Sequence, residues 1–315
     1  MQSQCIFATQ TPVGPPVEII RHSFSANAKK TGKRVSLVTG LHGDELEGLY
    51  ICHRLMGILK EREAQNALQG EVHVYPAANP QALDSGTRLW PFFSVDINRT
   101  FGENNTHSLA TDLSKALLAD LKSNSDLVVD FHASNLQLME LPQIRIIKDF
   151  EKKLVPLAQL CNVDLIWVHP HADIFESTLG TNLNQAKIPT LVIEAGICLR
   201  INKTYCEQII LGILNLLEQT GILQCTEPRT DIKNPKLLQP HQVAMVQSPN
   251  AGLFVKSVEI GQALQKGDKI GDLIDSSQKQ KEIIAPCSGL LFTLREYPTT
   301  GQGAPLARIA IEETS

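Results

Sequence analysis

The stretch LVTGLHGDELEG, residues 37 to 48, decides how the rest of the chain is interpreted. An apolar strand runs into a histidine, a glycine and two carboxylates, and a helical pattern begins directly after them. His42 and Glu45 are three residues apart, close enough to reach a common point if the chain turns sharply at Gly43. This is the spacing of two ligands on one metal ion, so we searched the sequence for a third.

Strand-like apolar runs alternate with amphipathic helical patterns from about residue 34 to residue 224. The runs are nearly continuous rather than alternating, which is typical of a sheet covered on both faces. The pattern therefore predicts an α/β fold with a mixed, mostly parallel sheet flanked by helices. The expected strands cover residues 34–42, 71–79, 126–134, 163–169 and 189–196, and the expected helices cover 45–63, 108–123 and 203–221.

The composition changes after this α/β region. Residues 226–242 contain three prolines and no helical pattern, which indicates a linker. Beyond them come short strand-like pieces punctuated by glycine, with a weak internal repeat. We therefore expect one domain over residues 1–230 and a small all-β, barrel-like domain over residues 240–315.

Composition narrows the classes of function. The chain has 315 residues, 20% of them charged, and a net charge of −4, which gives no reason to expect nucleic acid or an acidic membrane as a partner. Its apolar runs fall short of the roughly 20 residues that span a bilayer, and its first residues lack the pattern of a secretory signal. Seven scattered cysteines without a CxxC pair indicate reduced, cytoplasmic thiols. The sequence stays compatible with a homo-oligomer.

Two further strands end in candidate site residues. In open α/β sheets, ligands bind beyond the carboxyl ends of the strands, and His132 and Glu194 each follow an apolar run there. His42, Glu45 and His132 make a two-histidine, one-carboxylate set of the kind that holds catalytic zinc. Water on such an ion has a pKa near ~7, and Glu194 is the carboxylate expected to take its proton.

Other interpretations of these residues remain open at this point. His169 and His171 also follow a strand and are rival ligands. A histidine at a strand end is often a hydrogen-bonded structural residue, and Asp44 and Glu47 fit first-turn carboxylates favoured by the helix dipole. Zinc, one ion per chain, is the expectation for this set. Ligand sets of nitrogen and oxygen also accept other divalent ions.

The segment between the two halves of this site is rich in side chains that bind carboxylates. Residues 86–102, GTRLWPFFSVDINRTFG, contain Arg88, Asn98 and Arg99. Guanidinium groups match a carboxylate in geometry, and Asn98 adds an amide. These three side chains suggest a small substrate that bears a carboxylate. The alternative is that Arg99 and Asp96 only stabilise the conformation of a long loop.

The four motifs GLHGDELEG, DINRTFG, DFHAS and VIEAG resemble, in order and rough spacing, those of the succinylglutamate desuccinylase and aspartoacylase family, a branch of the zinc carboxypeptidase-like fold. The resemblance covers about residues 34 to 224. It implies a role for each matching position: His42, Glu45 and His132 as zinc ligands, Glu194 as the general base, Asn98 and Arg99 as the pair that holds the substrate carboxylate, Arg88 as the group that polarises the scissile carbonyl, and Asp96 as the acid that orients the first histidine.

The resemblance also implies an activity. Members of this family hydrolyse the amide of a small N-acyl amino acid, so a zinc-dependent deacylase acting on a linear C–N bond is expected. The C-terminal region resembles a biotinyl or lipoyl carrier barrel without the carrier lysine, since Gln278 stands at that position. Some relatives use a late tyrosine, and Tyr297 is the tyrosine of this region.

Three other functions are left open by the sequence. A metallocarboxypeptidase acting on short peptides would use the same carboxylate clamp. A non-catalytic metal- or ligand-binding protein would have no need for Glu194. A hydrolase acting on esters would use the same groups.

Overall fold

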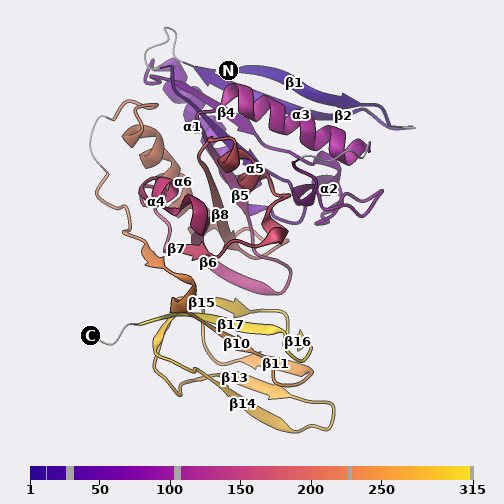
Figure 1. Ribbon diagram of the computed structural model, residues 1–315, viewed down its shortest axis with the longest axis vertical. Coiled ribbons are helices and arrows are strands. Elements are labelled where there is room, and N and C mark those ends of the chain that lie inside the picture. Colours follow the sequence, from indigo (N-terminus) through magenta and orange to yellow (C-terminus); the bar gives the residue numbers. More distant parts are fainter. Residues whose placement is uncertain (12, 26–31, 103–107, 226–228, 313–315) are drawn as a thin grey trace.

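The structure, a computed structural model, describes residues 1–11, 13–25, 32–102, 108–225 and 229–312. Within these ranges thirteen strands share one sheet, with the order β1-β2-β4-β3-β5-β8-β6-β15-β17-β10 and with β7, β9 and β12 attached to it. Helices surround the upper part of this sheet, and the C-terminal strands form its lower end and the smaller sheet beside it (Figure 1). Of the helices in the described residues, none has both the length and the apolar character that crossing a bilayer requires.

The centre of the sheet is parallel. β3 (Arg34–Thr39) lies between β4 (Glu71–Tyr75) and β5 (Leu127–His132), and β8 (Thr190–Gly196) follows β5, all in the same direction. β6 (Leu138–Ile147) then runs antiparallel to β8. The predicted α/β class with a mixed sheet is therefore confirmed.

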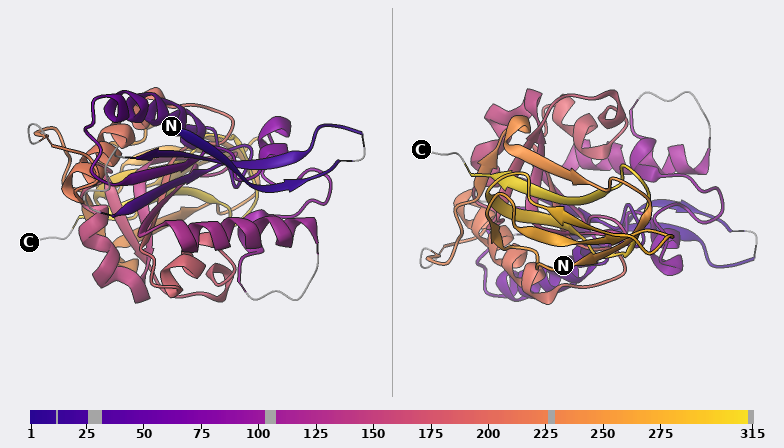
Figure 2. Two further views of the ribbon diagram at one scale, coloured as in Figure 1. Left: turned by 90° about the horizontal axis from the view of Figure 1, so that it is seen from above. Right: turned by 90° about the horizontal axis from the view of Figure 1, so that it is seen from below.

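Helices cover the two faces of this sheet (Figure 2). On one face α1 (Glu47–Ala64) and α6 (Lys203–Gln219) supply side chains to the largest apolar cluster. On the other face α3 (Leu109–Asn124) and α5 (Leu179–Gln185) supply the second cluster. Two short helices, α2 (Pro80–Ser85) and α4 (Glu151–Ala158), complete the set. The two-sided cover accounts for the continuous apolar strands, because neither face meets water.

Several elements were not predicted. The hairpin of β1 (Gln2–Thr9) and β2 (Val17–Ser25) extends the sheet beyond β4. Inside the expected linker, β9 (Lys236–Leu238) pairs with β7 (Leu165–His169). These segments are short or have partly exposed faces, so their apolar signal in the sequence is weak.

The C-terminal strands build two sheets. β15 (Gly289–Arg295) pairs with β6 and so continues the central sheet into β17 (Pro305–Ile311) and β10 (Val243–Gln247), with β12 (Ala263–Leu264) beside β15. The second sheet has the order β14-β13-β11-β16. Its strands are β11 (Gly252–Lys256), β13 (Lys269–Ile274), β14 (Gln280–Ile284) and β16 (Thr299–Thr300). The boundary between two domains stays a prediction, since one sheet runs through both regions.

Candidate active site

The turn after β3 places the first two candidate ligands. The strand ends at Thr39, three residues earlier than predicted, and Gly40 follows with a φ of +77°, where a side chain is strained. At Gly43 a Cβ atom would lie 1.8 Å from the carbonyl oxygen of Ala82 on α2. Only glycine fits this close approach, so the turn between His42 and the start of α1 is fixed by backbone packing.

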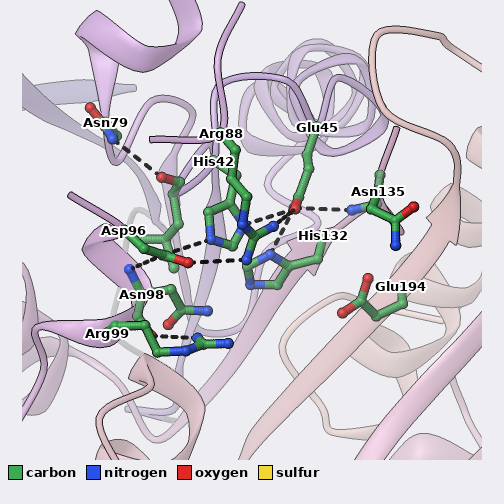
Figure 3. A network of polar contacts seen from close by, with 12 residues as sticks. His42, Glu45, Asn79, Arg88, Asp96, Asn98, Arg99, His132, Asn135 and Glu194 are labelled. Atoms are coloured by element: carbon green, nitrogen blue, oxygen red, sulfur yellow. Dashed lines mark hydrogen bonds and ion pairs between the residues drawn. The ribbon is translucent and has the colours of Figure 1, made fainter. Parts of the chain in front are cut away.

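His42, Glu45 and His132 converge at one point. The Nδ1 atom of His42 lies 2.7 Å from Oε1 of Glu45, and Nδ1 of His132 lies 2.8 Å from Oε2. One ligand atom from each residue falls within 4.8 Å of the others, and all three residues are buried. Figure 3 shows both rings next to the Glu45 carboxylate, joined to it by dashed lines.

Each imidazole ring contacts a second carboxylate through its other nitrogen atom, Nε2. Nε2 of His42 lies 3.0 Å from Oδ1 of Asp96, and Nε2 of His132 lies 3.1 Å from Oδ2 of Asp130. Such contacts fix the orientation and tautomer of a ring, here leaving Nδ1 toward the centre. The sequence analysis named Asp96 but missed Asp130. The signal was present, because residues two apart on a strand share one face.

The charges around this centre favour a cation. Burial alone lowers the pKa of His42 and of His132, but the neighbouring carboxylates outweigh it and raise both pKa values. Burial raises the pKa of Glu45, and the two histidines outweigh that effect and lower it to about 2. Two imidazoles and one carboxylate, each buried and each held in place, therefore fit a divalent metal ion of the kind that binds nitrogen and oxygen.

Glu194 lies beside this centre on the next strand. Its Cα atom pairs with that of His132 in the parallel register of β5 and β8, and its carboxylate points toward the triad (Figure 3). Burial raises the pKa of Glu194 to about 7, against the opposing effects of Arg145 and His132. Arg145 lies 3.2 Å from Oε1, whereas the buried Oε2 has no hydrogen-bond partner among the described residues. One oxygen of Glu194 is thus buried without a partner in the described part of the chain, which is the kind of group that a bound molecule would satisfy.

The 86–102 loop places its polar residues around the same centre. Nη1 of Arg88 lies 3.2 Å from Oε1 of Glu45, and Nη2 lies 3.1 Å from Oδ2 of Asp96. The backbone N–H of Asn98 donates to Asp96, and its side-chain oxygen accepts from the N–H of Leu179 at the start of α5. Asp96 therefore joins the loop to the histidine that it orients.

These residues surround one cavity of about 470 Å³. All predicted site residues except Asp96, which lies behind His42, contribute to its lining: His42, Glu45, Arg88, Asn98, Arg99, His132 and Glu194. The structure thus brings together residues from four separate parts of the chain: the turn after β3, the 86–102 loop, β5 and β8. The role of each one stays a prediction.

The rival histidines do not join the triad. His169 packs against Trp167 with ring centroids 4.0 Å apart, and burial, followed by Arg145 and Arg308, lowers its pKa to about 3. His171 instead forms ion pairs with two surface carboxylates.

Tyr297, the tyrosine of the C-terminal region, lies outside the cavity. Tyr297 is 52% exposed and lines a different hollow, between Leu136 and the segment after β8.

Arg145 was not predicted from the sequence, and His169 was considered only as a rival metal ligand. Both line the cavity, and Arg145 contacts Glu194 directly. A charged residue inside the apolar run of β6 is costly without a partner. That cost was the signal that could have identified Arg145.

Comparisons with known proteins agree with this geometry. The model of the succinylglutamate desuccinylase/aspartoacylase catalytic domain matches residues 31–220. The N-alpha-acetyl-L-2,4-diaminobutyric acid deacetylase of Halomonas elongata is 23% identical over 304 residues, which cover 94% of this chain and 85% of that protein.

Solved structures share the fold over almost the whole chain. A succinylglutamate desuccinylase from Silicibacter sp. gives a TM-score of 0.80 at 21% identity and covers 98% of this chain and 92% of its own. A product-bound ectoine utilization protein from Ruegeria pomeroyi gives 0.78 at 21% identity, with 94% and 90% covered. Because the family match spans more than half of the sequence and includes the whole candidate site, this chain belongs to the succinylglutamate desuccinylase/aspartoacylase family.

Proposed function

We propose that this protein is a zinc-dependent amidohydrolase that removes an acyl group from a small N-acyl amino acid. One observation carries the proposal: a buried triad that could hold a metal ion, a carboxylate with one oxygen unpaired among the described residues, and an Asn-Arg pair line a single cavity of about 470 Å³. A deacetylase among the relatives supports amide hydrolysis as the reaction. Seven free cysteines support a cytoplasmic location.

The metal ion would be held by Nδ1 of His42, Nδ1 of His132 and the Glu45 carboxylate. When bound, Zn²⁺ supplies a Lewis acid that acidifies water and polarises a carbonyl group. Asp96 and Asp130 keep both rings in the orientation that binding needs.

The chain's own residues move the proton and bind the substrate. Asn98 and Arg99 bind the carboxylate of the substrate, and this contact sets the scissile amide at the triad. Oε2 of Glu194 takes a proton from the attacking water as the new C–O bond forms. Glu194 then gives that proton to the amine nitrogen as the C–N bond breaks, so it ends the cycle in its starting state.

Arg88 is placed to stabilise the negative oxygen that forms on the former carbonyl. Its guanidinium lies between Glu45 and Asp96, held by one contact to each. Because these contacts exist before any substrate binds, the cation is already oriented when the charge develops. Such preorganised groups lower the barrier without a reorganisation cost.

The end of the cavity away from the triad suits an apolar group. Apolar side chains of its wall are Ile147 at the end of β6, Phe150 just before α4, Phe175 in the turn before α5, and Val192 on β8. The carboxylates among the described lining residues, Glu45, Asp130 and Glu194, all belong to the triad end. An apolar side chain or acyl chain therefore fits better than a cationic one.

The test combines metal content with a substrate panel. Purified wild type and His132→Ala are analysed by mass spectrometry for metal, and amine release is measured from N-acetyl and N-succinyl derivatives of leucine, phenylalanine, aspartate, glutamate and 2,4-diaminobutyrate. We expect about one zinc per wild-type chain, loss of metal and activity in the variant, and faster release from the apolar amino acids.

Tripeptides added to this panel, together with the metal analysis, separate the alternatives. Release of a C-terminal residue from tripeptides as fast as from N-acyl amino acids would favour a carboxypeptidase. A wild type without metal after zinc is supplied, and without turnover, would sink the proposal in favour of a binding protein. As a control, Glu194→Gln should keep its zinc and lose turnover.

A further inference from the structure

A fully buried carboxylate connects the C-terminal strands to the cavity. Glu140 on β6 has no solvent exposure, and each of its oxygens binds a different guanidinium group. Nη2 of Arg145 lies 2.6 Å from Oε2, and Nη1 of Arg308 lies 2.6 Å from Oε1. Arg145 belongs to the same strand, whereas Arg308 comes from β17 in the C-terminal region.

The second nitrogen of Arg145 reaches the proposed base. Nη1 lies 3.2 Å from Oε1 of Glu194 while Nη2 is bound to Glu140. One flat guanidinium group therefore spans two carboxylates, so its orientation depends on both. With Oε1 of Glu194 occupied, Oε2 is the oxygen that is left without a partner.

Arg308 is fixed from its own side. Its guanidinium lies over the ring of Trp167, 5.3 Å from the centroid, and Arg145 lies 6.0 Å from the same ring. Trp167 in turn packs edge-on against Phe292 of β15, with centroids 5.6 Å apart. The C-terminal strands thus determine where the Arg308 charge stands.

We propose that Arg308 and Glu140 are positioning residues that hold Arg145 against Oε1 of Glu194 and so keep Oε2 directed into the cavity. The inference rests on the proposed role of Glu194 as base. With Glu194 ionised, as a base must be, the four side chains carry two positive and two negative charges and the cluster is neutral. Among the described residues, Glu140 without Arg308 retains Arg145 as its one hydrogen-bonding partner. A buried carboxylate left short of a partner draws that guanidinium toward itself.

The kinetic test uses Arg308→Gln, Arg308→Lys and Glu140→Gln in the full-length, zinc-loaded enzyme. For Arg308→Gln we expect kcat to fall about 10- to 100-fold, as for other groups that orient a reacting side chain, with KM changed less than about three-fold. Arg308→Lys restores part of the loss because it returns the charge. The double variant of Arg308 and Glu140 is no worse than the poorer single variant, since both act through Arg145.

A matched control removes the general effect of weakening the C-terminal strands. Arg295 on β15 is also buried, but it donates to the backbone carbonyls of Pro305 and Thr299 rather than to Glu140. Arg295→Gln should leave kcat and KM near wild type even where its melting temperature falls as far as that of Arg308→Gln. Equal loss of kcat in both variants, or a change confined to KM, would overturn the inference.

A structural measurement keeps this test separate from the proposed function. Crystal structures of wild type, Arg308→Gln and Arg295→Gln show whether Arg145 leaves Glu194, whatever the substrate proves to be. We expect displacement in Arg308→Gln alone. If Arg145 stays in place in Arg308→Gln, the inference is contradicted. If the wild type hydrolyses no member of the panel, the proposed function is contradicted, and the crystal structures still show whether Arg145 has moved.

Discussion

Individual side chains of this site are held by charged partners outside the triad of His42, Glu45 and His132. Asp96 contacts both His42 and Arg88, so one carboxylate orients a ligand and an arginine together. Burial, outweighed by His42 and the arginines, leaves the pKa of Asp96 well below its usual range, and the group is ionised at neutral pH. A preorganised cation next to the triad is therefore available without any rearrangement.

Arg88→Ala should lower kcat by about 10²–10³ while zinc content stays at the wild-type level. The reason is the loss of one group aimed at the developing oxyanion. Steady-state kinetics on the best panel substrate, with metal analysis of the same sample, gives the measurement. Arg88→Lys serves as the control because it keeps the positive charge and loses the forked guanidinium group. Its kcat should fall between those of wild type and Arg88→Ala. Wild-type kcat and KM in Arg88→Ala would refute the assignment.

At the scale of elements, alternation along strands decides which residues enter the cavity. On β5, Asp130 and His132 face the cavity, while Val129 and Phe131 face the apolar cluster under α1 and α6. β7 carries its cavity residue, His169, against Trp167, and the charges of Arg145 and Arg308 act on it. A histidine placed there meets two positive charges and little water.

His169 should make the protein lose stability in acid. Its pKa is about 3 when folded, against 6.5 in its ordinary state, so between these values the folded chain binds fewer protons than the unfolded chain. The free energy of unfolding then falls as pH falls through this window, by up to about 1.4 kcal/mol per pH unit. Urea unfolding at pH 7 and pH 5 measures it, with His169→Asn as the comparison.

Wild type should lose more stability than His169→Asn between those two pH values. Other groups titrate in both proteins alike, so the difference between the two curves isolates this histidine. Parallel curves, or a ring that protonates near pH 6.5 by NMR, would show that His169 is not shielded as the structure indicates.

At the scale of the whole molecule, the central sheet passes from the site into the C-terminal strands. Three residue pairs join β6 to β15, and an apolar cluster made of Leu141, Leu165, Trp167, Leu238, Phe292 and Ala310 spans the two regions. The C-terminal strands therefore cover an edge and an apolar surface that the α/β region cannot cover by itself.

A chain that ends at residue 242 should be poorly soluble. It would lose Phe292 and Ala310 and expose Trp167, Leu165 and the edge of β6. Each large apolar side chain brought into water costs roughly 1.5–3 kcal/mol. Size-exclusion chromatography and thermal melting compare it with the full chain. A monodisperse product with an unchanged melting temperature would show that the α/β region is independent of its C-terminal strands.

Much of the site was visible in the sequence because its residues follow strong local signals. His132 ends an apolar strand, Glu194 interrupts one, and Gly43 marks the turn between His42 and Glu45. Ser108, the first residue of the expected 108–123 helix, caps α3. Asp130 and Arg145 were missed because their contacts become evident only in the folded sheet. Asp130 meets His132 on the same strand through side-chain direction, and Arg145 meets Glu194 on the neighbouring strand through register.

By itself the sequence determined the α/β class, the order of the central elements and the identity of the candidate ligands, because alternation, turns and strand ends are local properties of the chain. Only the tertiary structure decided that these residues share one cavity, that His169 and His171 stay outside the triad, and that Arg308 reaches Glu140 across 168 positions of sequence. Pairing of strands far apart in the chain fixes these contacts, and no spacing along the sequence encodes which distant strand lies alongside which.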